Sequence, residues 1–194
     1  MLKEIKNSTS RKKLYISIAA GINTSFIQEK LKKELKIARV MPNKPVVVQE
    51  GAFGLFFNGH VSPEEKESVI NLFDSLGHVE VVQDEQLINA VTGLSGSGPA
   101  YVAVFAEALA DGGVKMGLSR EIAEKLSAQT IYGTAKLILE SGMNPADIKN
   151  MVSSPGGTTI AAIHELEKNS FRNAVMSAVE SATVKSKELS SEED

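Results

Sequence analysis

The sequence predicts an α/β portion with a parallel sheet over residues 1–83, followed by an all-α portion over residues 84–194. Two observations predict this division. In the first portion, short apolar runs that end at glycine or proline alternate with amphipathic segments, as in parallel α/β folds. In the second portion the chain is rich in alanine, and its apolar residues recur almost throughout at helical spacing.

The α/β portion opens with the apolar run from Leu14 to Gly21, which we expect to be a buried parallel strand. The segment from Thr24 to Leu35 carries apolar residues at helical spacing, with lysines and glutamates between them, and predicts an amphipathic helix. The run from Ile37 to Met41 predicts a second strand. That strand stops at Pro42, because proline cannot donate a hydrogen bond to a sheet.

Two further strands are expected at 45–50 and 54–58, joined by a turn that contains glycine. The run 62–65, Ser-Pro-Glu-Glu, has the order of an N-cap, a proline at the first helical position and an acidic first turn. The helix that it starts is expected to end at Gly77, since glycine often follows the last turn of a helix. A last short strand is expected over 78–82.

The all-α portion is divided by helix start and stop signals into these expected helices: 84–110, interrupted at a Gly/Ser/Pro run, then 119–141, a short helix from Asn144, 159–168 and 171–189. Several of them have apolar residues on more than one face, which is typical of buried helices. A chain of this length cannot bury all of these faces by itself. We therefore expect an intertwined homodimer or a larger homo-oligomer, with a compact monomeric bundle as the alternative.

Composition excludes several classes of protein. The net charge is −3, so electrostatics give no reason to expect nucleic acid as a partner. Cysteine is absent, which removes thiolate catalysis and the usual zinc sites, and the three histidines lack metal-like spacing. No apolar run is long enough to span a membrane, and the basic N-terminus lacks the apolar core of a signal peptide. We expect a cytoplasmic protein with no metal and no membrane partner.

Two runs of small and hydroxyl residues, 92–101 and 153–159, are the strongest functional signal. Each is expected to lie where a helix begins, so that its backbone N–H groups face a ligand. The start of a helix has unpaired N–H groups and a partial positive charge, which suit a carboxylate or a phosphate. The two runs therefore predict a site for an anionic small molecule. For the segment 95–99 of the first run, the alternative is a close helix–helix contact through glycine.

A resemblance to the pyrroline-5-carboxylate reductase family is carried by five runs of the sequence: 16–22, 39–43, 90–101, 108–118 and 152–159. Enzymes of this family use NAD(P)H to reduce a cyclic imino acid to proline, in the last step of proline synthesis. The resemblance covers roughly residues 14–189. It implies a partial Rossmann-like parallel sheet, followed by a helical dimerisation domain that also binds the imino acid.

The resemblance also has consequences for the cofactor, which would be NADP or NAD. Members of this family begin with a strand, a G-x-G-x-x-G turn and a helix, all of which would lie ahead of Met1. Cofactor binding and activity are therefore expected to be weakened or lost in this chain. Lys44 departs from the family pattern, which usually has a small residue there, and it could pair with a cofactor phosphate or obstruct the site. Two other functions stay open: a non-catalytic dimerisation and anion-binding remnant of the enzyme, and an anion-binding helical regulatory domain.

For the substrate carboxylate, the resemblance implies the backbone amides of Gly157, Thr158 and Thr159. The hydroxyl of Thr159 would bond the ring nitrogen and could relay a proton, which makes it the expected catalytic residue. Alternatively, Thr158 or Thr159 only caps the following helix. The full set expected to bind the substrate is Ser97, Ser154, Gly156, Gly157, Thr158 and Thr159.

The nicotinamide is expected near the ends of the first two strands and the first glycine run. Ligands of open α/β sheets gather beyond the carboxyl ends of the strands. The set expected to bind the cofactor is Ala19, Ala20, Gly21, Met41, Pro42, Asn43, Ser95 and Gly96. Asn43 could equally be a turn residue that follows proline.

Overall fold

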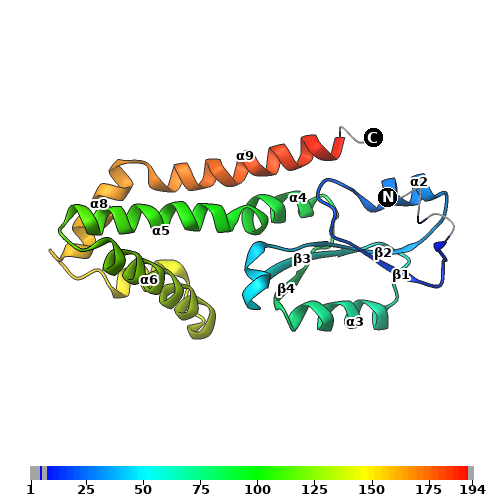
Figure 1. The fold of residues 1–194 in the computed structure, drawn as a ribbon, viewed down its shortest axis with the longest axis horizontal. Coiled ribbons are helices and arrows are strands. Elements are labelled where there is room, and N and C mark those ends of the chain that lie inside the picture. Colours follow the sequence, from blue (N-terminus) through cyan, green and yellow to red (C-terminus); the bar gives the residue numbers. More distant parts are fainter. Residues whose placement is uncertain (1–4, 6–7, 192–194) are drawn as a thin grey trace. The chain divides into compact units, whose positions relative to one another are not determined.

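The computed structural model describes Ile5 and residues 8–191, and the chain forms two compact units (Figure 1). The first unit contains the described residues up to Pro99 together with the residues from Ser177 onward. The second unit is Ala100–Met176. The chain changes from strands to helices after Val81, and the last long helix returns to the first unit.

The first unit is built on a four-stranded sheet with the order β1-β2-β3-β4. Its strands are β1 (Leu14–Ser17), β2 (Lys36–Met41), β3 (Gly51–Phe57) and β4 (Gly77–Val81). The pairs β1–β2 and β3–β4 are parallel, whereas β2 and β3 are antiparallel. The predicted α/β class is confirmed, but the sheet is mixed. The short link between β2 and β3 explains this, because a parallel pair needs a crossover of a dozen residues or more.

The strand expected at 45–50 is wrong, because Lys44–Val48 forms a short 3-10 helix, η2. Three consecutive valines favour a strand by propensity, but Pro45 lacks the N–H that a sheet requires and sits at the start of η2. The side chains of Val47 and Val48 are 69% and 68% exposed, so no sheet face buries them. The first strand also differs from the expectation, since it ends at Ser17 and is only partly buried.

Helices cover both faces of this sheet (Figure 1). On one face, α3 (Pro63–Asp74) packs Val69 against buried side chains of β2 and β3. On the other face, α2 (Thr24–Leu31) packs Ile27 and Leu31 against Ile37. Since successive strand side chains point to opposite faces, neighbouring residues of β2 belong to two separate apolar clusters.

The N-terminus of α3 is the predicted one and it is tightly held. Ser62 accepts a hydrogen bond from the Glu65 N–H, and the Glu65 carboxylate accepts one from the Ser62 N–H, which completes a capping box. The Lys36 ammonium lies 2.7 Å from Glu65 Oε1. Lys36, and after it the Ser62 N–H, lower the pKa of the Glu65 carboxyl. The helix therefore attaches to β2 through a charge as well as through its apolar face.

The first glycine run continues a helix instead of starting one. The short α4 (Leu87–Val91) leads into a π-helical turn, η3 (Thr92–Gly96), which leads into α5 (Gly98–Lys115). The Ser97 N–H donates to the Thr92 carbonyl at 2.8 Å, the five-residue step of a π-helix. The interruption expected within the helix 84–110 is thus one π-helical turn, through which the helix continues.

Gly93 in this turn lies against α9 (Phe171–Ser191), within the first unit. A Cβ added at Gly93 would lie 2.7 Å from the Val179 carbonyl oxygen and still closer to Thr183 Oγ1. Only glycine lets the two backbones approach this closely. A close helix–helix contact through glycine thus exists at Gly93, outside the segment 95–99 for which the sequence left that alternative open.

The second unit contains most of α5, then α6 (Arg120–Ser141), α7 (Pro145–Met151), α8 (Thr158–Lys168) and the start of α9. Ser119 and Asn144 cap α6 and α7 with their side chains, and Gly142 ends α6 in the left-handed region at a φ of 68°. These starts and stops are the predicted ones. No described helix of the chain is both long enough and apolar enough to cross a membrane.

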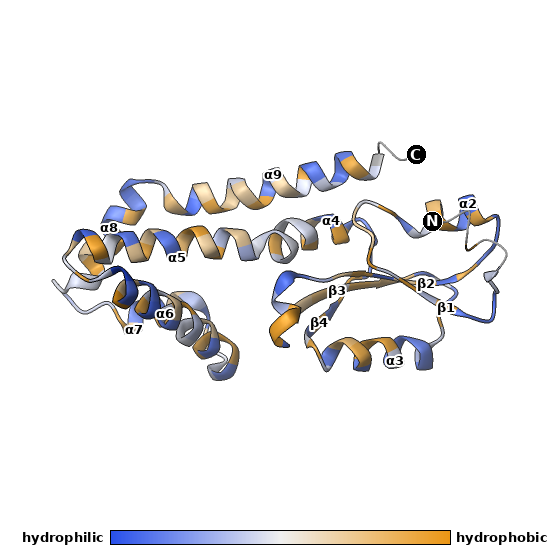
Figure 2. Ribbon diagram, viewed as in Figure 1, coloured by the Kyte–Doolittle hydropathy of each residue, from blue (hydrophilic) through white to orange (hydrophobic). Residues whose placement is uncertain are grey.

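The helices of the second unit carry hydrophobic residues along their length (Figure 2), and many of these side chains are exposed. Among its described residues, the buried apolar side chains are those of Ala110, Ala123 and Ile148. Leu139 is 79% exposed and Val104 is 65% exposed. A unit with so few buried side chains has little hydrophobic stabilisation of its own, because that term scales with the apolar area removed from water.

Gly93→Ala is expected to destabilise the protein by about 1–3 kcal/mol, the usual range for overpacking a tight contact. The measurement is urea unfolding followed by circular dichroism. Gly112→Ala, inside α5, is the matched control, because nothing lies within 4 Å of a Cβ added there. That control should be neutral or stabilising, since alanine is the better helix former. Equal stabilities of the two variants would show that α9 does not need glycine at position 93.

Candidate functional site

The carboxyl ends of β1 and β2 lie at one edge of the sheet, because the two strands are parallel neighbours. The predicted cofactor residues Ala19–Gly21 and Met41–Asn43 follow these two strand ends directly. Ala19 and Ala20 are exposed, and their small side chains leave this edge open. Gly21 has a φ of 78°, which strongly favours glycine, and so its presence has a structural reason too.

Asn43 joins two segments at this edge. Its side-chain Nδ2 donates to the Ser95 carbonyl at 3.1 Å, and its Oδ1 accepts from the Ala52 N–H at 2.9 Å. It also stands at the N-cap position of η2, but its side chain makes no capping bond there. Asn43 is therefore more than a turn residue, because it ties η3 to the start of β3.

Gly96 lies against Met41 at the same edge. A Cβ at Gly96 would come within 2.8 Å of Met41 Cε, which is the end of a flexible side chain. The structure thus brings Met41, Asn43, Ser95 and Gly96 together, as the cofactor set requires. One expectation for the first glycine run is wrong. The N–H groups of η3 are not those of a helix start, because the helix continues through η3. Ser95 Oγ likewise donates to the Val91 carbonyl at 3.1 Å.

The second glycine run does precede a helix. Gly157 is the N-cap of α8, and Thr158 and Thr159 are its first two residues. The threonines therefore do not cap the helix, which removes the alternative interpretation of them. Gly156 has a φ of 68°, so the turn that leads into α8 favours glycine at that position.

The N-terminus of α8 differs from those of α2, α3, α6 and α7. Side chains of Asn23, Ser62, Ser119 and Asn144 accept hydrogen bonds at the N-termini of α2, α3, α6 and α7. The N-cap of α8 makes no side-chain hydrogen bond, because Gly157 has no side chain. The first N–H groups of a helix have no acceptor within the helix. This N-terminus can therefore donate to an anion, as predicted for a substrate carboxylate.

One amide of the expected set is already used. The Gly157 N–H donates to the Ser154 carbonyl at 3.1 Å, which closes the turn. The donors suited to a carboxylate are then the N–H groups of Thr158 and Thr159. The residue Thr159 is partly buried, whereas Thr158 is exposed. Ser97, the remaining predicted substrate residue, belongs to the first unit, and the run 153–159 belongs to the second.

The sequence reasoning missed a buried ion pair in the first unit. Arg39 on β2 lies 3.2 Å from Glu85 Oε1, with side chains 4% and 18% exposed. The Glu85 carboxylate also accepts from the N–H and from the hydroxyl of Thr24, both at 2.7 Å. The available signal was a charged residue between the apolar Ala38 and Val40, within a strand expected to be buried.

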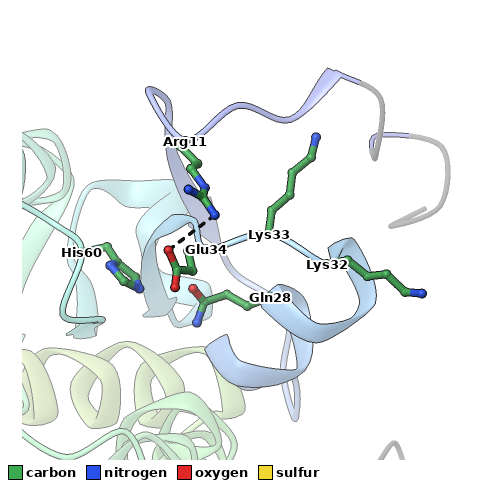
Figure 3. Close-up of a pocket in the computed structure, with 6 residues that line it drawn as sticks. All are labelled: Arg11, Gln28, Lys32, Lys33, Glu34 and His60. Atoms are coloured by element: carbon green, nitrogen blue, oxygen red, sulfur yellow. Dashed lines mark ion pairs between the residues drawn. The ribbon is translucent and has the colours of Figure 1, made fainter.

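A basic pocket lies at the other end of α2 and is lined by Arg11, Gln28, Lys32, Lys33, Glu34 and His60 (Figure 3). Arg11 pairs with Glu34 at 3.5 Å, and both side chains are about 70% exposed (72% and 69%). Such exposed pairs contribute little stability. Within the described part of the chain, no group of three or more acidic or histidine side chains is placed to hold a metal ion.

Comparison with known families matches residues 85–189 to a family model described as pyrroline-5-carboxylate reductase dimerisation. The pyrroline-5-carboxylate reductase of Arabidopsis thaliana is 46% identical over 187 residues, which are 96% of this chain and 67% of that protein. The enzyme of Methanosarcina acetivorans is 44% identical over 189 residues, covering 97% of this chain and 70% of its own length.

Solved structures agree with the sequence relatives. A pyrroline-5-carboxylate reductase from Coxiella burnetii superposes with a TM-score of 0.93 at 39% identity, covering 97% of this chain and 70% of that one. A pyrroline carboxylate reductase from Plasmodium falciparum, solved with NADP bound, gives a TM-score of 0.89 at 42% identity, covering 97% and 71%. Both the identity and the coverage are high enough to show descent. This chain belongs to the pyrroline-5-carboxylate reductase family.

Proposed function

We propose that this chain acts in the NAD(P)H-dependent reduction of 1-pyrroline-5-carboxylate to L-proline, as a homodimer or larger homo-oligomer. The observation that carries the proposal is the N-terminus of α8, where Thr158 and Thr159 follow an N-cap without a side chain. In a chain of this family, those free donors suit the carboxylate of the imino acid. The relatives are pyrroline-5-carboxylate reductases, and one of them was solved with NADP bound, which supports the reaction and its cofactor.

In the proposed reaction, the chain's own residues hold the imine and handle its proton. The N–H groups of Thr158 and Thr159 bind the carboxylate. The hydroxyl of Thr159 then bonds the ring nitrogen and passes it a proton from water, while the imine carbon receives a hydride. This transfer balances, because one hydride and one proton convert the C=N bond to CH–NH. When bound, NAD(P)H supplies the hydride.

The edge formed by the ends of β1 and β2 fits the nicotinamide end of such a cofactor. Exposed Ala19 and Ala20 permit close approach, and Asn43 fixes the neighbouring loop through Ser95 and Ala52. Lys44 is exposed next to that loop, where its ammonium can reach a phosphate. The 194 residues contain no G-x-G-x-x-G turn, which normally holds the pyrophosphate.

A second candidate function is a non-catalytic dimerisation and anion-binding module, since the family model that matches residues 85–189 is described as one of dimerisation. Such a module would keep the carboxylate site at α8, because that site uses backbone donors of the second unit only. It would not reduce the imine. Turnover at millimolar NADPH separates the two functions: slow turnover is expected of an impaired reductase, and none of the module.

The first prediction concerns the carboxylate site. Proline should raise the melting temperature, and pyrrolidine, which lacks the carboxylate, should not. Thr159→Ala should weaken proline binding by about 1 kcal/mol, the net value of one hydrogen bond. Thermal-shift titration measures both effects. Thr134→Ala, in α6, is the control, since that exposed hydroxyl bonds the Thr130 carbonyl of its own helix. Equal stabilisation by pyrrolidine and proline would make the α8 turn purely structural.

The second prediction concerns the cofactor. The 194-residue polypeptide should bind NADPH very weakly, because the adenosine and pyrophosphate supply much of the cofactor's binding energy through the absent turn. Titration followed by nicotinamide fluorescence tests this. A dissociation constant in the low micromolar range, or turnover near the usual enzyme median of about 10 s⁻¹, would contradict it.

The third prediction concerns assembly. The purified chain should have at least twice its monomer mass of 20.8 kDa in solution. The exposed apolar residues of α5, α6 and α9 are the surface expected to be buried, and an obligate interface of this kind covers well over about 2,000 Å². Light scattering coupled to size exclusion gives the mass. A monomer at micromolar concentration would rule the assembly out.

A further inference from the structure

One partly buried carboxylate, that of Glu85, connects segments that follow or belong to the two strands of the proposed cofactor edge. Its Oε1 accepts from the Thr24 N–H at 2.7 Å and pairs with Arg39 Nη1 at 3.2 Å. Its Oε2 accepts from the Thr24 hydroxyl at 2.7 Å. Both oxygens are therefore engaged, by groups from two different elements. Hydrogen bonds that involve a charged group are among the stronger ones in proteins.

The partners of Glu85 lie just beside the segments that would face the cofactor. Thr24 is the first residue of α2 and follows the turn at Gly21 by three positions. Arg39 lies on β2, two positions before Met41. A negative charge at the N-terminus of α2 is favourable, since the helix dipole is positive there. The Glu85 carboxylate thus contacts both the start of α2 and a residue near the end of β2, and it links the two segments.

Along the chain, Glu85 lies between β4, the last strand, and α4. Its carbonyl accepts from the Ile88 N–H at 3.1 Å in the first turn of α4. The same helix continues into η3, where the Ser95 carbonyl accepts from Asn43. Strand β2 and the loop after it are therefore held at two places along the segment 85–95, through Arg39 at Glu85 and through Asn43 at Ser95.

Stability alone does not explain this cluster. A buried ion pair is often no more stabilising than apolar residues of similar size, and the neighbours Ala38 and Val40 are apolar. Arg39 Nε is buried and has no hydrogen-bond partner among the described residues. The arrangement therefore leaves one donor unsatisfied while it keeps the two strand ends in a fixed relation.

We propose that Glu85 is a positioning residue for the nicotinamide edge. It sets the segment Ala19–Gly21 through Thr24, and it sets the segment Met41–Asn43 through Arg39. The proposal rests on the proposed function, because it concerns the same cofactor edge. It implies that loss of the Glu85 carboxylate weakens binding of NADPH and leaves binding of proline at α8 unchanged.

The experiment compares three variants with the unmodified chain. Glu85→Gln removes the charge, Thr24→Val removes one hydrogen bond with little change of shape, and Thr24→Ser keeps the hydroxyl. Asp84→Asn is the matched control, because this exposed neighbouring carboxylate accepts a hydrogen bond from the Gln86 N–H and does not contact Thr24 or Arg39. NADPH is titrated to millimolar concentration by nicotinamide fluorescence, proline by thermal shift. Amide exchange is followed by mass spectrometry in 18–24 and in 41–52.

Glu85→Gln should raise the dissociation constant for NADPH about tenfold or more, as misplacement of a binding element does. Thr24→Val should raise it less, and Thr24→Ser should restore it. Exchange should become faster in both segments with Glu85→Gln, and only in 18–24 with Thr24→Val. The proline concentration that gives half of the maximal thermal shift should be the same in every variant.

Equal losses of NADPH and proline binding, or uniform acceleration of exchange, would overturn the proposal and make the cluster a general stabiliser. An effect of Asp84→Asn as large as that of Glu85→Gln would do the same. If Glu85→Gln does not fold, the contrast between Thr24→Val and Thr24→Ser decides. If the unmodified chain shows no NADPH binding, the cofactor part of the proposed function fails, and exchange in the two segments still tests the role of Glu85.

Discussion

The second unit cannot bury its own apolar surface, and this constraint dominates the physics of the chain. Among its described residues only Ala110, Ala123 and Ile148 are buried apolar residues, while side chains such as Leu139 and Val104 remain largely in water. Apolar area left in water forfeits about 25 cal/mol per Å² of stabilisation. The family model that covers these helices is one of dimerisation. A second copy of the chain is the simplest partner for such faces.

The two candidate sites rely on different kinds of chemistry. At α8 the donors are backbone N–H groups, so the site depends on the turn at Gly156 and Gly157 and hardly on side chains. At the sheet edge the positions are set by side chains that reach across the first unit: Asn43 to Ser95, and Glu85 to Thr24 and Arg39. Point substitutions should therefore harm the edge more readily than the turn.

Local chemistry explains which elements could be predicted. Capping residues and glycine stops act on their own neighbours, so Ser62, Ser119 and Asn144 were identified correctly as helix starts. The run 45–50 was misread because three valines favour a strand, whereas Pro45 and the short distance to β3 favour a tight 3-10 turn. The strand preference of single residues is overridden where the chain must reverse direction within a few residues.

The sequence by itself determined the change from strands to helices, the family, and the glycine turn before α8, because each depends on residues that are close together in the chain. Only the tertiary structure decided the antiparallel β2–β3 pair, the continuous helix through η3, and the role of Gly93 against α9. It also decided the partnership of Arg39 with Glu85, 46 positions apart. These features depend on contacts between segments that are distant in the sequence. Such contacts are set by packing and by ion pairing, which exist only in the folded chain.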